Sequence, residues 1–107
     1  MKLYDDTMIS VGIIGASGYT GAELLRICSR HPSFEVKTAV ASTYAGKAIS
    51  DVHVHLSPEF PEMLFEDKDS APLSECEIIF TGLPHGASQK VIPEFLETAK
   101  LIVDLGA

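Results

Sequence analysis

Three glycines at every third position, Gly15, Gly18 and Gly21, form the pattern in this chain that is best suited to chemistry. They follow the apolar run 11–14 and open a segment with helical periodicity. A glycine accepts a positive φ and has no Cβ to block an approaching group. The first amides of a helix lack acceptors within the helix, and the helix dipole favours negative charge there. The stretch therefore predicts an anion-binding turn between a strand and a helix.

Each glycine of this turn has a separate expected role. We expect Gly15 to make the tight turn off the strand, Gly18 to let a phosphate approach the backbone, and Gly21 to let helix and strand pack closely. The spacing differs from the commoner G-x-G-x-x-G of dinucleotide-binding folds, but the position between strand and helix is the same. The alternative is a glycine-rich corner that binds nothing.

The loop after the predicted strand 34–41 bears on the choice of dinucleotide. A site that prefers NAD usually places an acid there, which binds the 2′-hydroxyl of the adenosine ribose. Residues 42–47 contain no acid and provide instead the hydroxyls of Ser42 and Thr43 and the ammonium of Lys47. These groups are compatible with a 2′-phosphate, so the sequence favours NADP over NAD. The alternative is a plain polar loop.

A second strand-to-helix corner, Gly-Leu-Pro-His-Gly-Ala-Ser, follows the predicted strand 77–81. Such corners line the ligand crevice of open α/β sheets. We expect this corner to pass under the nicotinamide or its ribose, with His85 and Ser88 close to the cofactor. Gly86 and Ser88 also suit the start and the cap of the next helix, and the two interpretations are compatible.

For the remaining histidines and the two cysteines we predict no role in chemistry. His53 and His55 would lie on one face of a strand, at a spacing that suits metal ligands. No carboxylate or cysteine stands at a recognisable ligand spacing nearby, so we predict surface or packing histidines and no metal site. Cys28 and Cys76 do not stand at a strand end near a histidine, as covalent catalysis would require. The sequence thus contains a cofactor half-site and no catalytic residue.

The elements that must position these residues alternate between strand and helix. Apolar runs predict strands, and segments of period 3.6 predict helices. The predicted strands are 9–14, 34–41, 77–81 and 101–104, and the predicted helices are 19–30 and 88–98. This order indicates an α/β fold: a Rossmann-like, doubly wound parallel sheet with helices on both faces, truncated at its C-terminal end.

Three local expectations refine this scheme. Thr20 and Glu23 have the spacing of a capping box at the start of the first helix. Alternate residues of the second strand would share one face of the sheet: Phe34, Val36, Thr38 and Val40. A short strand is expected at 63–66, in a segment broken by prolines and dominated by acids, which we interpret as a solvated face.

Composition sets the broad class. The 107 residues suit one domain with a modest core, and a hydrophobic content of 46% is ordinary for a globular protein. The net charge of −7 argues against nucleic acid as a partner. No apolar run approaches the ~20 residues of a membrane span, and no signal peptide is visible. The two cysteines form no disulfide framework, so the cytoplasm is the expected compartment.

Residues 15–26, Gly-Ala-Ser-Gly-Tyr-Thr-Gly-Ala-Glu-Leu-Leu-Arg, resemble the start of the N-acetyl-γ-glutamyl-phosphate reductase family. The resemblance continues in family order through 30–32, 42–47, 55–56, 83–88 and 104–107. It implies that residues 1–107 are the NADP-binding Rossmann-like domain of a longer, homo-oligomeric enzyme of arginine biosynthesis. The aminoadipyl-phosphate reductase of lysine biosynthesis shares these motifs, and aspartate-semialdehyde dehydrogenase matches them less well. A non-catalytic nucleotide-binding module is the alternative from another class.

The resemblance also implies a reaction and a set of contacts. The family reduces an acyl phosphate to an aldehyde: a cysteine thiolate takes the acyl group, and NADPH delivers hydride. That cysteine stands in a Gly-Cys-Tyr-Pro-Thr motif which, like the assisting histidine, has no counterpart here, so no catalytic residue is carried over. The residues implied at the pyrophosphate are Gly15, Ala16, Ser17, Gly18, Tyr19, Thr20 and Gly21. Ser42 and Thr43 would flank the 2′-phosphate. The nicotinamide side would be lined by Leu83, Pro84, His85 and Gly86.

Overall fold

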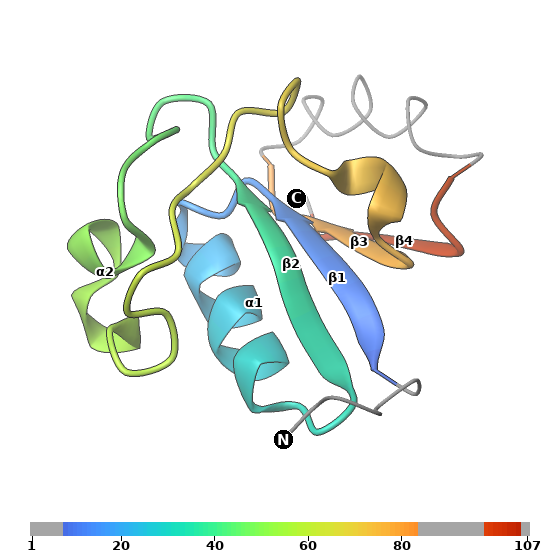
Figure 1. The fold of residues 1–107 in the computed structure, drawn as a ribbon, viewed down its shortest axis with the longest axis horizontal. Coiled ribbons are helices and arrows are strands. Elements are labelled where there is room, and N and C mark those ends of the chain that lie inside the picture. Colours follow the sequence, from blue (N-terminus) through green and yellow to red (C-terminus); the bar gives the residue numbers. More distant parts are fainter. Residues whose placement is uncertain (1–7, 84–97, 106–107) are drawn as a thin grey trace.

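The computed structural model describes residues 8–83 and 98–105, which form a parallel sheet of strand order β2-β1-β3-β4 (Figure 1). The strands are β1 (Ile9–Ile14), β2 (Phe34–Val40), β3 (Ile78–Thr81) and β4 (Leu101–Asp104). The strand order reverses at β1, because β2 pairs with one of its edges and β3 with the other. Ligand crevices of open α/β sheets lie at the carboxyl ends of the strands where the order reverses. The predicted Rossmann-like α/β class is confirmed.

β1 is buried on both faces, as its unbroken apolar run predicts. Val11 and Ile13 are fully buried in the cluster that contains helix α1 (Tyr19–Arg30). Ile14, at 3% exposure, packs in a second cluster on the opposite face. The strand therefore ends between two packed layers, and the turn that follows it starts from a fixed position.

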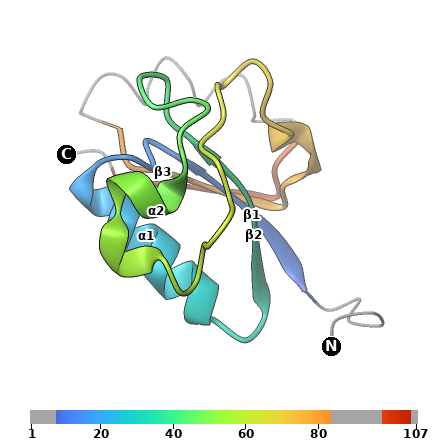
Figure 2. The same cartoon turned by 60° about the vertical axis from the view of Figure 1, so that its left-hand side comes forward.

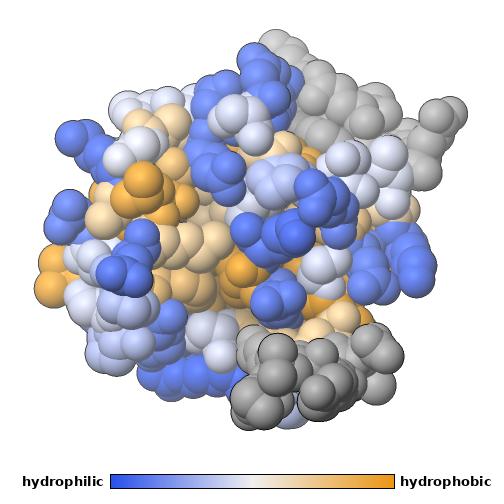
Figure 3. Space-filling model, viewed as in Figure 1, coloured by the Kyte–Doolittle hydropathy of each residue, from blue (hydrophilic) through white to orange (hydrophobic). Residues whose placement is uncertain are grey.

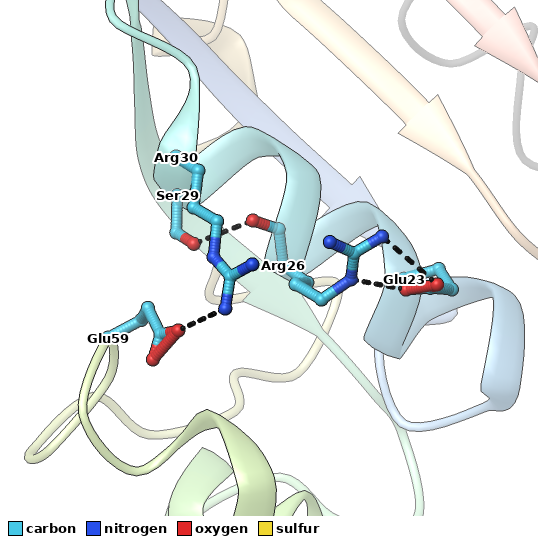
Figure 4. A network of polar contacts seen from close by, with 5 residues as sticks. All are labelled: Glu23, Arg26, Ser29, Arg30 and Glu59. Atoms are coloured by element: carbon cyan, nitrogen blue, oxygen red, sulfur yellow. Dashed lines mark hydrogen bonds and ion pairs between the residues drawn. The ribbon is translucent and has the colours of Figure 1, made fainter.

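Helix α1 has the predicted bounds and buries three apolar side chains against the sheet: Leu24, Leu25 and Cys28. The predicted capping box is wrong. Gly18 is the N-cap, no side chain caps it, and Thr20 already lies inside the helix. Glu23 instead accepts a hydrogen bond of 2.7 Å from Arg26 on the outer side of α1 (Figure 4), and this bond lowers the pKa of Glu23. The glycine turn, and not a capping side chain, sets where the helix begins.

β2 contains an irregularity that its sequence pattern does not predict. Two consecutive residues of β1 pair with Val36 and Thr38, so Lys37 is an extra residue in the strand. One extra residue transfers every later side chain to the other face. The prediction that alternate residues of this strand share one face is therefore wrong. Phe34 and Val36 pack on the α1 side of the sheet, whereas Val40 packs on the opposite side.

The segment after β2 folds back beside α1. It forms the short helix α2 (Ile49–Val52) and the 3-10 helix η1 (Val54–Leu56), which lie next to α1 (Figure 2). Ile49 and Leu56 are fully buried in the same cluster as α1. His53 and His55 therefore do not lie on one face of a strand, which is the arrangement that their spacing would need to hold a metal ion. At the far end of α1, Arg30 contacts Glu59 at 3.2 Å (Figure 4).

The strand expected at 63–66 is also wrong, because only isolated bridges form there. Leu64 pairs with Ala48 and Glu66 pairs with Val40. The two bridges have different partners and opposite directions, antiparallel to Ala48 and parallel to Val40, so they do not join into one ladder. The acids of the surrounding stretch are mostly exposed, as a solvated face requires. Figure 3 shows hydrophilic residues over much of this side of the molecule, with apolar surface between them.

The second face of the sheet carries a smaller cluster of buried residues: Ile14, Val40, Leu73, Cys76 and Ile79. The 3-10 helix η2 (Leu73–Glu75) belongs to it.

The predicted helix 88–98 lies outside the described residues apart from its last position, as do Pro84, His85, Gly86 and Ser88. Among the described helices, none has the length and apolar character that crossing a membrane demands.

Candidate functional site

Two of the three glycines of the turn are required by the protein itself. Gly15 has φ +80°, and a Cβ there would stand 3.0 Å from the carbonyl carbon of Gly82. A Cβ on Gly21 would stand 2.6 Å from Ala16 Cα and would overlap the Gly15 carbonyl oxygen as well. The turn off β1 and the close packing of the helix start therefore follow the predicted roles.

Gly18 is different, because nothing in the described structure requires a glycine there. Its φ is −82°, which any residue adopts, and a Cβ would come no closer than 3.9 Å to another atom, the Gly15 carbonyl oxygen. Among the described residues, the missing side chain thus leaves open space at the helix start. That space is where the sequence predicts the approach of a phosphate.

Several amides of the turn have no backbone acceptor outside α1 within the part of the chain that the structure describes. The amides of Gly15 and Ala16 both donate to the Val40 carbonyl at 3.0 Å. Within the described residues, no backbone carbonyl outside α1 accepts a hydrogen bond from the amides of Ser17, Tyr19 or Thr20. Unpaired amides at the start of a helix are an anion-binding arrangement.

A cavity of about 280 Å³ opens where β1, β2 and β3 end. Its walls contain five of the residues predicted from the sequence: Gly15, Ser17, Ser42, Thr43 and Leu83. Three stretches that are far apart in the chain therefore meet at one crevice, as predicted. Four aliphatic residues at or just past the strand ends belong to the lining: Ile14, Val40, Ala41 and Leu83. An apolar floor with polar walls suits a flat aromatic base and its ribose.

Gly18 and the remaining predicted residues of the turn do not line this cavity. Ala16 is fully buried, and the side chain of Tyr19 is 97% exposed. Thr20 and Gly21 lie in the first turn of α1. Lys47 is exposed and also lies outside the lining. Of the second corner, only Gly82 and Leu83 are described.

Three residues that sequence reasoning missed complete the cavity wall: Asp67, Lys68 and Asp69. They reach it because residue 66 pairs with the end of β2: Ala41 donates to the Glu66 carbonyl at 3.0 Å, and Glu66 donates to the Ala39 carbonyl at 2.8 Å. Asp67 turns back on its own loop and accepts a hydrogen bond from the Asp69 amide at 3.1 Å. In the sequence these residues form a charged turn beside a buried aromatic residue. That pattern is the same for a cavity wall and for a solvated face, so it does not predict a binding role.

Both cysteines are buried, and burial raises the pKa of each thiol to about 11. A thiol acts as a nucleophile only when it is ionised. Cys28 and Cys76 therefore stay protonated at neutral pH and serve as packing residues. Among the described residues, no three histidine, cysteine or acidic side chains come together in a way that would hold a metal ion.

Comparison with known proteins gives one family and several relatives. Residues 10–107 match the model of the semialdehyde dehydrogenase NAD-binding domain. N-acetyl-γ-glutamyl-phosphate reductase of Methanopyrus kandleri is 42% identical over 102 residues, which are 94% of this chain and 30% of the relative. The enzyme of the same name from Thermoanaerobacter pseudethanolicus is 43% identical over 100 residues, 94% of this chain and 29% of the relative.

A solved structure supports the fold. Aspartate semialdehyde dehydrogenase with NADP from Candida albicans superposes with a TM-score of 0.75 at 24% identity, over 92% of this chain and 30% of that one. The chain therefore spans about 30% of the length of the curated relatives it matches.

Proposed function

The chain belongs to the semialdehyde dehydrogenase NAD-binding domain family, and we propose that it binds NADP(H) as the cofactor domain of an N-acetyl-γ-glutamyl-phosphate reductase. The observation that carries the proposal is the open space at Gly18, beside amides that have no backbone acceptor among the described residues. A diphosphate would occupy that space and accept hydrogen bonds from those amides. A Cβ at this position would fill it.

The adenosine half of the cofactor fits the cavity at the ends of β1 and β2. The hydroxyls of Ser42 and Thr43 are exposed at its wall, and Lys68 adds a cation to the same wall. Hydroxyls and an ammonium are the groups that hold a phosphate on the 2′-oxygen. The same wall also carries the carboxylates of Asp67 and Asp69, one of which, Asp67, accepts a hydrogen bond from the Asp69 amide.

The preference for NADP(H) is tested by titrating the protein with NADPH and with NADH in a calorimeter. We expect tighter binding of NADPH. Ser42→Asp places a carboxylate beside the ribose, so it should weaken NADPH binding and favour NADH. Ser74→Asp is the matched control, because it adds the same charge at an exposed position outside the cavity. Equal affinities for both cofactors in the wild type would refute the 2′-phosphate assignment.

The proposed reaction is the reductive dephosphorylation of an acyl phosphate to the semialdehyde, as in the relatives' name. NADPH supplies the hydride when it is bound. The described residues bind and orient the cofactor and contain no activated thiol, so we assign the acyl-transfer step to the part of the enzyme beyond this chain. The protein of 107 residues should bind NADPH without reducing N-acetyl-γ-glutamyl phosphate. Turnover by this chain alone would disprove that assignment.

We also propose that the whole enzyme is a cytoplasmic homo-oligomer and that residues 1–107 act as one cofactor-binding domain within it. The two free, buried cysteines support a reducing compartment. Light scattering on the whole enzyme would measure its mass, and a monomer would contradict the oligomer.

A further inference from the structure

We propose that His53 is a positioning residue that aims the Ser17 amide of the glycine turn at the cofactor's pyrophosphate. The proposal rests on the function proposed above, since it assigns that turn a ligand. His53 is 8% exposed and stands at the end of α2. Its Nε2 lies 2.9 Å from the carbonyl oxygen of Ala16, 37 residues away in the chain. A carbonyl oxygen only accepts hydrogen bonds, so Nε2 carries the proton and donates it.

This hydrogen bond fixes a single peptide unit. The Ala16 carbonyl and the Ser17 N–H belong to the same planar trans peptide, so they point in opposite directions. Holding the carbonyl toward His53 therefore holds the Ser17 N–H on the other side. Ser17 lines the cavity, and its amide has no backbone acceptor within the described residues. The Ser17 amide is thus oriented, and no described backbone carbonyl accepts a hydrogen bond from it.

Two further contacts hold Ala16 in place. Its own amide donates to the Val40 carbonyl at 3.0 Å, and its side chain is fully buried. With His53 on the carbonyl, Ala16 is held on both sides of its Cα. A hydrogen bond to a carbonyl also polarises the peptide and makes its N–H a better donor. The Ser17 amide is therefore both oriented and strengthened before a ligand arrives.

The imidazole itself is held in place, as a positioning residue requires. The edge of its ring meets Phe65, with centroids 5.9 Å apart and an interplanar angle of 80°. Its backbone amide donates to the Ile49 carbonyl at 2.7 Å. The Phe65 amide donates to the Lys47 carbonyl at 2.9 Å, which ties the residue that contacts the ring to the loop after β2. The loop after β2 thus contributes to the proposed pyrophosphate site through His53 as well as to the proposed ribose site through Ser42 and Thr43.

The test compares side chains that differ in reach. In His53→Gln the amide nitrogen extends about as far as Nε2, in His53→Asn it is one methylene shorter, and in His53→Leu no donor remains. His31→Leu is the matched control, because His31 is exposed at the end of α1 away from the turn and its ring packs on Phe34 and not on His53. By calorimetry with NADPH we expect the Gln variant within about threefold of wild type and the Asn and Leu variants weaker by about tenfold or more. The control should be unchanged.

A second measurement does not depend on binding. The carbonyl-carbon NMR resonance of Ala16 reports its hydrogen bond, and it should move in the Asn and Leu variants and stay in place in the Gln variant. Thermal unfolding of each variant separates this effect from stability: a purely structural His53 would make affinity follow stability across the set. NADPH affinity and an Ala16 resonance that are both unchanged in His53→Asn would overturn the proposal. If the wild type fails to bind NADPH, the proposed function falls, and the Ala16 resonance alone decides whether His53 holds the turn.

Discussion

At the scale of single residues, the glycines of the turn separate into two kinds, and substitution distinguishes them. Gly21 faces backbone atoms that cannot move away, whereas Gly18 faces open space. An added side chain should therefore have different consequences at the two positions. A side chain at Gly21 should destabilise the fold, and a side chain at Gly18 should weaken ligand binding.

Gly18→Val should leave the fold intact and abolish NADPH binding. The backbone at this position suits any residue, and the nearest atom to a Cβ is 3.9 Å away. Replacing an N-cap glycine by valine costs about 1 kcal/mol. Calorimetry and thermal unfolding of the same sample check both halves. Affinity equal to that of the wild type would refute the phosphate assignment of the turn.

Gly21→Ala is the counterpart, with the smallest possible side chain. Its Cβ would stand 2.6 Å from Ala16 Cα, and such overpacking costs about 1–3 kcal/mol or more. The loss should appear in urea unfolding with or without cofactor. A Gly21→Ala variant as stable as the wild type would show that the helix start yields more easily than its packing indicates.

The thiols give a prediction with a definite sign. Burial raises the pKa of Cys28 and Cys76 to about 11 from an ordinary 9.0. Above pH 9 the unfolded chain loses thiol protons that the folded chain keeps, so these groups contribute stability below pH 9 that is lost as the pH rises toward 11. At pH 9, iodoacetamide should modify native protein much more slowly than urea-unfolded protein. Equal rates would contradict the burial of both thiols.

At the scale of elements, the extra residue in β2 decides which side chains reach which layer. Lys37 forms an ion pair with Glu75 at 3.1 Å, but both side chains are largely exposed. The importance of position 37 therefore lies in the register of the strand and not in the charge. After it, Ala39 faces the α1 layer and Val40 the opposite layer.

Deleting Lys37 should consequently be far more damaging than replacing it. Lys37→Ala removes an exposed ion pair and should change the free energy of unfolding by less than about 1 kcal/mol. The deletion would turn the end of β2 over and should destabilise by more than about 3 kcal/mol. Urea unfolding of both variants makes the comparison. A deletion as mild as the substitution would mean that the strand slips back into register.

At the scale of the whole molecule, the crevice forms because the parallel strands end together. Residues from the ends of β1, β2 and β3 and from the loop at 67–69 meet around one cavity. A ligand that binds there contacts all of these segments at once and binds only the folded state. Its effect must therefore appear in the unfolding of the entire chain.

NADPH at a hundred times its dissociation constant should stabilise the protein by about 2.7 kcal/mol. For a domain of this size, that corresponds to a rise in Tm of roughly 10 °C or more. Differential scanning fluorimetry with NADPH, with NADH and with Gly18→Val checks the result. An unchanged Tm in the presence of saturating NADPH would contradict binding to the folded chain.

The sequence by itself determined the unit from β1 to the end of α1, including its bounds and the roles of Gly15 and Gly21. Those features depend on neighbours a few residues apart, which a local pattern records. The meeting of Ser42, Thr43 and Leu83 with the turn also followed from the sequence, because parallel strands must bring their carboxyl ends to one edge.

Only the tertiary structure decided the rest. The bridge between Glu66 and β2 carries Asp67, Lys68 and Asp69 to the cavity, and the fold of the loop after β2 brings His53 to Ala16. The sequence likewise did not predict that Lys37 is an extra residue in β2, because an extra residue is recognised only from the pairing with the neighbouring strand. Each of these depends on contacts between distant parts of the chain, and their register is fixed by packing and not by any local pattern of residues.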